Sequence, residues 1–380
     1  MPLTHQNSPR CSLYLVTPLL SAAAADAFGK IFAEALEAAP TACALVRFAP
    51  GSEAHAKAIV APLLRPARDA DCALLIENQA RLAARLGADG VHVAGDGEDL
   101  VEAIKSLKPE RIVGAGSLRT RDEAMTAGEM GADYVMFGEP HGGVQTMGLA
   151  SLVSLTERVV WWAEIFETPC VAYADTIQAA GTLAEAGADF VALGDAIWGS
   201  SSPAAAVREA HAKAIVAPLL RPARDADCAL LIENDGRLAA RLGADGVHVA
   251  GDGEDLIEAI KSLKPERIVG AGSLPTRDEA MTAGEMGADY VMFGEPHGGA
   301  QTRGLASLVS LTERVVWWAE IFETPCVAFA DTIAAAGALA EAGADFVALG
   351  DAVWGSSSRT AAVREAQALI AGAGAGAGAP

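Results

Sequence analysis

Three closely spaced acids are the first residues of this 380-residue chain whose types and spacing could do chemistry. Asp96, Glu98 and Asp99 lie in the stretch LGADGVHVAGDGEDL, directly after the β-rich run GVHV. Carboxylates that lie close together on a loop after a strand can serve as ligands of a metal ion. The same acids also open a helical segment, where the helix dipole alone favours negative charge. The sequence leaves both interpretations open for Asp96 and Asp99.

The acidic stretch occurs twice because a long segment of the chain is duplicated. Residues 53–208 and 209–364 align without a gap at an offset of 156 and differ at 12 positions. Solenoid repeats are roughly 20–50 residues long, so this unit is of a different kind. Taking one repeat of 156 residues out of 380 leaves 224, the length of one ordinary domain. The pattern indicates a tandem duplication of part of one gene, either natural or engineered.

Short apolar runs rich in β-formers alternate with Ala-rich segments of helical periodicity, and these elements must position the acids. The predicted strands of the first copy are 13–17, 43–48, 72–76, 90–93, 111–115, 134–138, 170–174 and 190–194. This alternation indicates βαβ units and a parallel sheet covered on both faces. Eight such units in about 210 residues predict a (β/α)8 TIM barrel. A doubly wound open sheet fits less well, because no G-x-G-x-x-G follows the first strand.

The duplication sets the domain organisation. We expect residues 1–208 to form a complete barrel, and 209–364 a partial barrel of six further βα units that lacks the first two strands. The last helix of the first copy should run through residue 208 without a linker. Residues 365–380, rich in Gly and Ala, are expected to be a disordered tail. Which copy closes with the first two strands stays open, as does a homo-oligomer formed through the partial barrel.

Composition excludes several classes of function. A net charge of −21 argues against nucleic acid and against an anionic membrane surface as partners. No apolar run approaches the roughly 20 residues of a membrane span. None of the six cysteines forms a CxxC pair, so we expect neither disulfides nor zinc, and we expect a cytoplasmic location.

Several stretches together resemble the thiamine phosphate synthase and TenI-like family. They are LYLVTP, LLIEN, LGADGVHV with its acidic tail, RIVGAGS, GADYVMFG and GADFVALGDAI. The resemblance covers residues 12–200 and, for six of eight units, 209–356. It implies a (β/α)8 barrel that joins a pyrimidine diphosphate to a thiazole phosphate and releases pyrophosphate with the help of Mg²⁺.

The resemblance also implies a site at the carboxyl ends of the strands. It places Mg²⁺ at Asp96 and Asp99, and it identifies no single catalytic side chain. The substrate-binding residues that it implies are Arg47, Glu77, Asn78, Ser117, His141 and Asp195.

The chain departs from the family pattern at several phosphate-binding positions. Arg47 is kept, but Leu45 and Ala49 flank it where the family has Gln and Lys, and Asp195 stands where a Ser holds the thiazole phosphate. Carboxylates outnumber cations at the predicted mouth. The acids are Glu77, Asp96, Glu98, Asp99, Glu139, Asp175 and Asp195, whereas the cationic candidates are Arg47, Arg119 and His141.

Three hypotheses for function follow. The first is a thiamine phosphate synthase-type transferase with unorthodox phosphate ligands. The second is a family member that has lost transferase chemistry and binds a less charged small molecule. The third is a duplicated or engineered scaffold without enzymatic activity. His92, between two valines on a strand, is interpreted as a barrel-layer or interface residue rather than a ligand.

Overall fold

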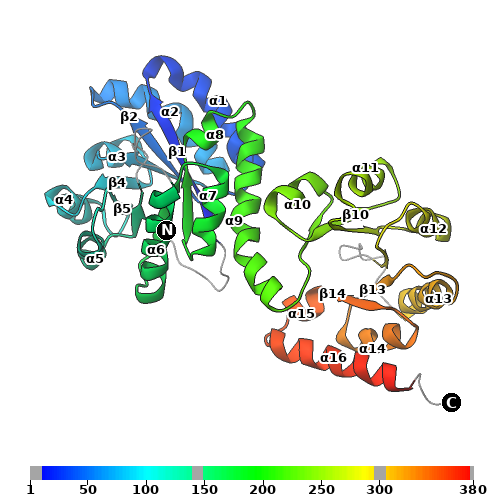
Figure 1. Ribbon diagram of the computed structural model, residues 1–380. Helices are drawn as coiled ribbons and strands as arrows, with labels where there is room; N and C mark the ends of the chain where they lie inside the picture. Colours follow the sequence, from blue (N-terminus) through cyan, green and yellow to red (C-terminus); the bar gives the residue numbers. More distant parts are fainter. Residues whose placement is uncertain (1–10, 139–148, 295–304, 377–380) are drawn as a thin grey trace. The chain divides into compact units, whose positions relative to one another are not determined.

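The computed structural model describes residues 11–138, 149–294 and 305–376. Eight parallel strands close into a barrel, and six more form a separate parallel sheet (Figure 1). The prediction of a (β/α)8 barrel followed by a partial barrel of six further units is therefore confirmed. In the described part of the chain no helix is both long enough and apolar enough to cross a membrane.

The closed barrel follows the chain in order, with each strand pairing with the next and β1 pairing with β8. Its strands are β1 (Ser12–Leu20), β2 (Cys43–Phe48), β3 (Ala73–Glu77), β4 (Gly90–Ala94), β5 (Ile112–Gly116), β6 (Tyr134–Phe137), β7 (Cys170–Ala174) and β8 (Phe190–Leu193). Its helices are α1 (Ala22–Ala38), α2 (Glu53–Asp69), α3 (Ala80–Leu86), α4 (Glu98–Leu107), α5 (Arg121–Glu129), α6 (Leu149–Ile165), α7 (Ile177–Glu185), α8 (Asp195–Trp198) and α9 (Pro203–Asp225).

The recurring Gly-Ala-Asp joints connect a helix end to the next strand. Gly87, for example, has φ +80°, a left-handed conformation that ends α3 at little steric cost. The aspartate of the same joint then accepts a hydrogen bond from the strand before the helix: Asp89 Oδ2 lies 2.8 Å from the Leu74 nitrogen. Asp133 and Asp189 bind their preceding strands in the same way. Each joint therefore both stops a helix and fixes neighbouring strands to each other.

The barrel interior contains a buried polar chain. The hydroxyl oxygens of Tyr14 and Tyr134 lie 2.9 Å apart, and His92 Nδ1 lies 2.9 Å from the Tyr134 hydroxyl. Two glycines on β5 provide the space that these side chains occupy. A Cβ at Gly114 would lie 1.9 Å from the Tyr134 ring, and one at Gly116 would lie 2.3 Å from His92 Nε2. The interpretation of His92 as a barrel-layer residue is thus confirmed.

The second sheet repeats six of the eight units in the order β14-β13-β12-β11-β10-β9. Its strands are β9 (Leu231–Glu233), β10 (Gly246–Ala250), β11 (Ile268–Gly272), β12 (Tyr290–Phe293), β13 (Cys326–Ala330) and β14 (Phe346–Leu349). Its helices are α10 (Gly236–Leu242), α11 (Glu254–Leu263), α12 (Arg277–Glu285), α13 (Leu305–Ile321), α14 (Ile333–Glu341), α15 (Asp351–Trp354) and α16 (Arg359–Gly376).

The first strand of the second sheet is shorter than predicted. The duplicate of the predicted strand 72–76 spans residues 228–232, but β9 begins at Leu231. In the barrel, the corresponding residues of β3 pair with β2 from Cys43 to Val46. The second sheet has no counterpart of β2, so residues 228–230 lack that ladder.

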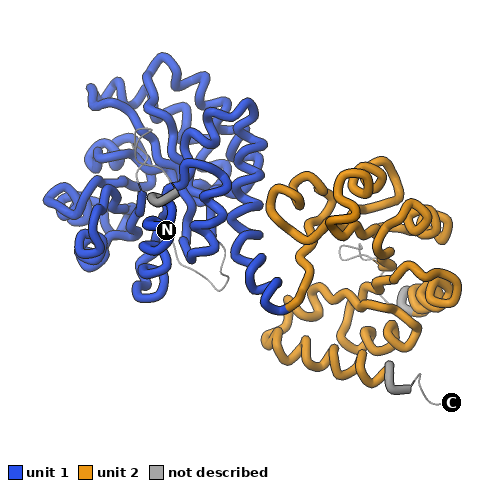
Figure 2. The backbone as a smooth tube through the Cα atoms, viewed as in Figure 1, with its two compact units in different colours: residues 1–226 blue, residues 227–380 orange. Residues whose placement is uncertain are grey.

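The chain divides into two compact units, residues 1–226 and 227–380 (Figure 2). The predicted continuous helix across residue 208 is confirmed as α9, which belongs to the first unit and packs against α1 and α7. Residues 365–376, expected to be disordered, instead continue α16, which begins at Arg359; Ala is the commonest residue in this stretch and the strongest helix former. Residues 377–380 lie outside the described part.

Candidate active site at the barrel mouth

The carboxyl ends of the eight barrel strands bring several of the predicted residues to one end of the closed barrel. Arg47 lies near the end of β2 and Glu77 ends β3, while Ser117 and Asp195 directly follow β5 and β8. Active sites of this fold lie at this end, because the loops after all strands converge there. His141 was also predicted here but lies outside the described residues.

Arg47 and Glu77 form an ion pair at the mouth. The distance between Arg47 Nε and Glu77 Oε1 is 3.6 Å, and their side chains are only 12% and 13% exposed. The backbone nitrogen of Arg47 also donates a hydrogen bond to Thr17 Oγ1 at 3.0 Å, which ties β2 to β1 at this level. The pair thus places one cation, partly neutralised by a carboxylate, where a substrate would enter.

Tyr173 on β7 joins this group, although the sequence did not single it out as a site residue. A Cβ built on Gly194 would lie 2.9 Å from the Tyr173 hydroxyl, so Gly194 makes room for the phenol. Burial raises the pKa of Tyr173, the Asp195 carboxylate raises it further, and the charge of Arg47 opposes this shift. Tyr173 is therefore a neutral hydrogen-bond donor close to both charges. One signal was available: Phe329 replaces Tyr173 in the second copy.

Asn78 has a structural task of its own. Its φ is +55°, and its Oδ1 accepts a hydrogen bond from the Ala94 nitrogen at 2.8 Å. The backbone nitrogen of Asn78 in turn donates to the His92 carbonyl oxygen at 2.7 Å. Asn78 therefore fixes the ends of β3 and β4 to each other through its side-chain oxygen and its backbone nitrogen.

The acidic loop after β4 is the candidate metal position. Asp96 is half-buried, whereas Asp99 is exposed in the first turn of α4, next to Glu98. Within the described ranges, no group of three or more His, Cys, Asp or Glu residues gathers in a way that could hold a metal ion. Mg²⁺ commonly binds in proteins through one or two carboxylates, together with water and a substrate phosphate, and Asp96 and Asp99 are residues of this ligand type.

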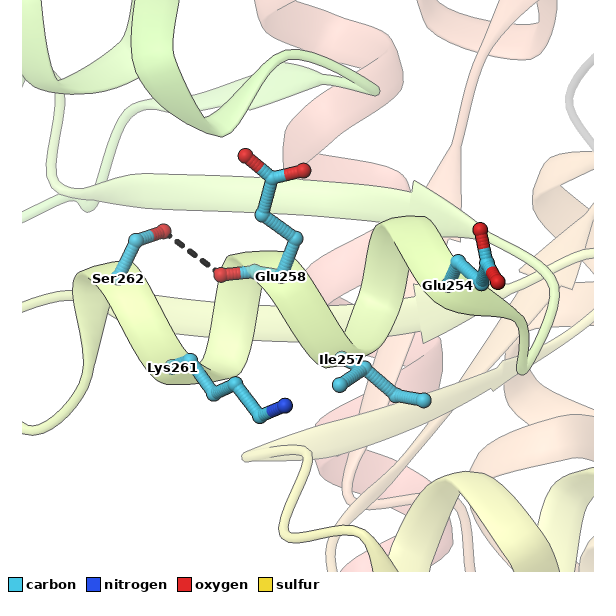
Figure 3. Close-up of a pocket in the computed structure, with 5 residues that line it drawn as sticks. All are labelled: Glu254, Ile257, Glu258, Lys261 and Ser262. Atoms are coloured by element: carbon cyan, nitrogen blue, oxygen red, sulfur yellow. Dashed lines mark hydrogen bonds between the residues drawn. The ribbon is translucent and has the colours of Figure 1, made fainter.

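The second unit reproduces only part of this site. Glu233 corresponds to Glu77, but it is exposed, and no residue of the second copy corresponds to Arg47 or Thr17. A hollow in this unit lies along α11 and not at the ends of the strands (Figure 3). Its lining includes Glu254, Glu258 and Lys261, and Glu258 is already paired with Arg237 at 2.5 Å. This hollow lacks the features of a phosphate site.

The fold and the site define a (β/α)8 barrel with a polar mouth, and comparisons with known proteins identify its family. The sequence profile described as thiamine monophosphate synthase matches residues 13–197 and again residues 204–353. The chain belongs to this family, as its sequence motifs predicted.

Curated relatives agree with this assignment. The thiamine-phosphate synthase of Rhodospirillum centenum (strain ATCC 51521 / SW) is 40% identical over 206 residues, which cover 95% of that protein but 52% of this chain. The thiamine-phosphate synthase of Hyphomonas neptunium (strain ATCC 15444) is 35% identical over 216 residues, 96% of that protein and 55% of this chain. Nearly the whole length of each relative therefore corresponds to about half of this chain.

A solved structure described as thiamine phosphate pyrophosphorylase from Pyrococcus furiosus is also similar. It is 21% identical and has a TM-score of 0.45, and the match covers 53% of this chain and 95% of that one.

Proposed function

We propose that the closed barrel is a thiamine phosphate synthase-type transferase that acts at its mouth. It joins a pyrimidine diphosphate to a thiazole phosphate and releases pyrophosphate. Family membership supports the reaction, and one observation supports its location: Arg47 is held nearly buried at the strand ends, on β2. Catalysis of such a transfer depends on neutralising the negative charge that accumulates on the leaving diphosphate.

The residues of the mouth have distinct roles in this proposal. Arg47 binds a phosphate oxygen, since a guanidinium donates several hydrogen bonds to phosphate in a fixed geometry. Ser117 and the side-chain nitrogen of Asn78 donate further hydrogen bonds, and His141, which follows β6 in the sequence but lies outside the described residues, is a further candidate. Tyr173, kept neutral by burial, donates to an uncharged part of the substrate.

Magnesium is part of the same proposal. When bound, Mg²⁺ supplies charge neutralisation to the diphosphate, and Asp96 and Asp99 hold it from the protein side. The repulsion between the substrate and the acids of the mouth would be offset by the charge of the bound cation.

A second candidate function follows from the Arg47–Glu77 pair. A cation that already has a carboxylate at 3.6 Å attracts a dianion less strongly than an unpaired one. Together with Asp195 close to Tyr173, this arrangement favours a less charged ligand, such as a thiazole or pyrimidine without its phosphate.

Paired binding and activity measurements separate the two functions. The melting temperature of the chain is measured with the thiazole phosphate, the pyrimidine diphosphate and the corresponding alcohols, with and without Mg²⁺. The transferase predicts stabilisation by the phosphorylated compounds, which requires Mg²⁺ for the diphosphate, and release of pyrophosphate when both are present. Arg47→Ala should abolish both effects. Arg65→Ala, a change in an exposed pair on α2, is the control.

Stabilisation by the alcohols alone would support the second function and contradict the first. Stabilisation by none of the compounds would contradict both and leave a non-enzymatic scaffold. We also propose a reducing compartment, the cytoplasm, which the six free cysteines support.

A further inference from the structure

The duplicated sheet repeats both strand edges that hold the β1–α1–β2 unit in the closed barrel. In the barrel, the unit β1–α1–β2 fits between β8 and β3. Residues 12–15 pair with β8 from Phe190 to Leu193, and residues 43–46 pair with β3 from Ala73 to Ile76. The corresponding edges of the second sheet, residues 229–232 and Phe346–Leu349, have identical sequences. β9 and β14 are the two ends of that sheet.

Side chains that the β1–α1–β2 unit buries in the barrel are exposed in the second sheet. Phe190 is 6% exposed within the barrel interior, whereas its counterpart Phe346 is 61% exposed. Val207 of α9 is fully buried, whereas Val363 of α16 is 40% exposed. These differences mark the footprint of the missing unit, because the residue types are the same in both copies.

A tryptophan anchors the unit in the barrel. The Trp198 indole nitrogen donates a hydrogen bond to the Val16 carbonyl oxygen at 2.7 Å, and its ring packs against Phe28 and Phe32 of α1, with centroid distances of 4.9 and 6.3 Å. Trp354, the counterpart of Trp198, is 65% exposed. A large aromatic side chain that fits a preformed partner surface is the typical centre of a binding interface.

We propose that the open edges of the second sheet bind the β1–α1–β2 unit of a second copy of this chain. The acceptor then closes a second ring of eight strands, and the donor barrel opens. In the exchange, pairing of the unit with β8 and β3 of its own barrel is replaced by pairing with edges of the same sequence in the second sheet of the other molecule. The free energies of the two arrangements should therefore be similar. The fraction of molecules that exchange depends on protein concentration, because a second copy competes with the chain's own unit, whose effective concentration is about 1 mM.

The helix α9 favours a second copy over the chain's own unit as donor. The second half of α9 is the duplicate of α2 and leads into β9, and its residues Ala214 and Ala217 are fully buried. Because α1 packs against α9, moving the chain's own unit would uncover the very helix that precedes the acceptor sheet. A unit from another molecule leaves α9 and the barrel of the acceptor intact.

Two cysteines report on the exchange. Cys72 precedes β3 and is 3% exposed, whereas its duplicate Cys228 is exposed and the other four cysteines are buried. Withdrawal of the unit should expose Cys72, and docking of the unit should protect Cys228. Tryptic peptides 69–81 and 225–237 differ at two positions, Gln79/Asp235 and Ala80/Gly236, so mass spectrometry distinguishes the two labels.

The test is a brief pulse of iodoacetamide applied to the full chain over a range of concentrations. At micromolar concentration the label should lie on Cys228. In the dilute range each tenfold rise in concentration should raise labelling of Cys72 about tenfold, with an equal loss at Cys228. Labelling of Cys72 that does not depend on concentration would assign the site to the chain's own unit and overturn the proposal. Loss of label at Cys228 without gain at Cys72, or no change at any concentration, would also overturn it.

Two matched variants sharpen the test. Phe346→Asp places a carboxylate that is tolerated while exposed but would be buried on docking, so labelling of Cys72 should stay at its dilute-limit value. Phe190→Asp makes the same change in the barrel, so the label should move from Cys228 to Cys72. If Phe190→Asp fails to fold, Phe346→Asp alone still decides: a rise in Cys72 labelling like that of the parent chain would overturn the proposal.

Discussion

The guanidinium of Arg47 and the carboxylate of Glu77 lie 3.6 Å apart at the carboxyl ends of adjacent strands, and both side chains are nearly buried. This pair links the two proposed functions, because it supplies a cation for phosphate and reduces the charge that the phosphate meets. The first prediction tests how strongly the Glu77 carboxylate weakens the binding of phosphate to Arg47.

Changing Glu77 to Gln should strengthen the binding of thiazole phosphate. The substitution removes a carboxylate that competes with the ligand for Arg47, and we expect a gain of about tenfold, or ~1.4 kcal/mol. Isothermal titration calorimetry measures it. Glu233→Gln, at the duplicated position without an arginine partner, is the control and should change nothing. Unchanged or weaker binding in Glu77→Gln would show that the carboxylate is needed to orient Arg47.

Changing Asp195 to Ser should also strengthen the binding of thiazole phosphate. Asp195 begins α8, and its carboxylate acts on Tyr173, which the charge of Arg47 also reaches. A hydroxyl there donates a hydrogen bond, whereas the carboxylate repels a dianion. We expect a gain of several-fold in affinity by calorimetry, and none for Asp351→Ser in the second unit. Equal affinities for the parent chain and Asp195→Ser would contradict this role.

The chain should bind at most one ligand of the family type. Only the closed barrel combines Arg47, Thr17 and Tyr173, since the second copy begins after the first two strands and has Phe329 in place of the phenol. A phosphate pocket of this fold needs groups from several strands at once. Calorimetric titration at low protein concentration should therefore saturate at one equivalent or less. Two equal and independent sites per chain would refute the assignment.

The native chain should resist ionisation of its tyrosines. Burial raises the pKa of each of the four, to about 12 for Tyr290. A folded-state pKa above the ordinary value of 10 means that the native state holds the proton more tightly than the unfolded state. The stability that the neutral phenols contribute is therefore fully present below pH 10, and it is lost as the pH rises through the folded-state values.

Absorbance titration of tyrosinate measures this directly. The native chain should show little change until the pH exceeds 10, whereas the chain in guanidinium chloride should titrate around its ordinary value of 10. The free energy of unfolding should decrease over the same alkaline range. A native titration curve that coincides with the unfolded one would show that the four phenols are not buried in solution.

Much of the fold follows from the sequence alone. Eight alternations of strand and helix are encoded within short segments, several helices are stopped by Gly or capped by Ser or Thr, and the alternation predicts parallel βα units wherever it occurs. The sequence alone likewise predicts the duplication, the continuous helix at residue 208 and the family membership. The extent of β9 does not follow from the local sequence, because the length of a strand also depends on the strands that pair with it.

The site required the closed barrel. Arg47 and Glu77 are 30 residues apart in the sequence, and only the pairing of β2 with β3 brings their side chains together. The hydrogen bonds that occupy Asn78, and the influence of both Asp195 and Arg47 on Tyr173, also depend on contacts between distant segments. Residue types identified the acids and the arginine as candidate site residues. They could not show which of these side chains already have partners.

The two copies separate what sequence and tertiary structure decide. Phe190 and Phe346 lie in identical tetrapeptides and form the same local strand, because backbone conformation follows from nearby residues. One is buried and the other exposed, because the strands that cover Phe190 belong to residues 12–48, which occur once in the chain. Local sequence therefore determined the same six βα units in both copies. Only closure of the ring decided which copy has a core on both faces of its sheet and a mouth that can bind a ligand.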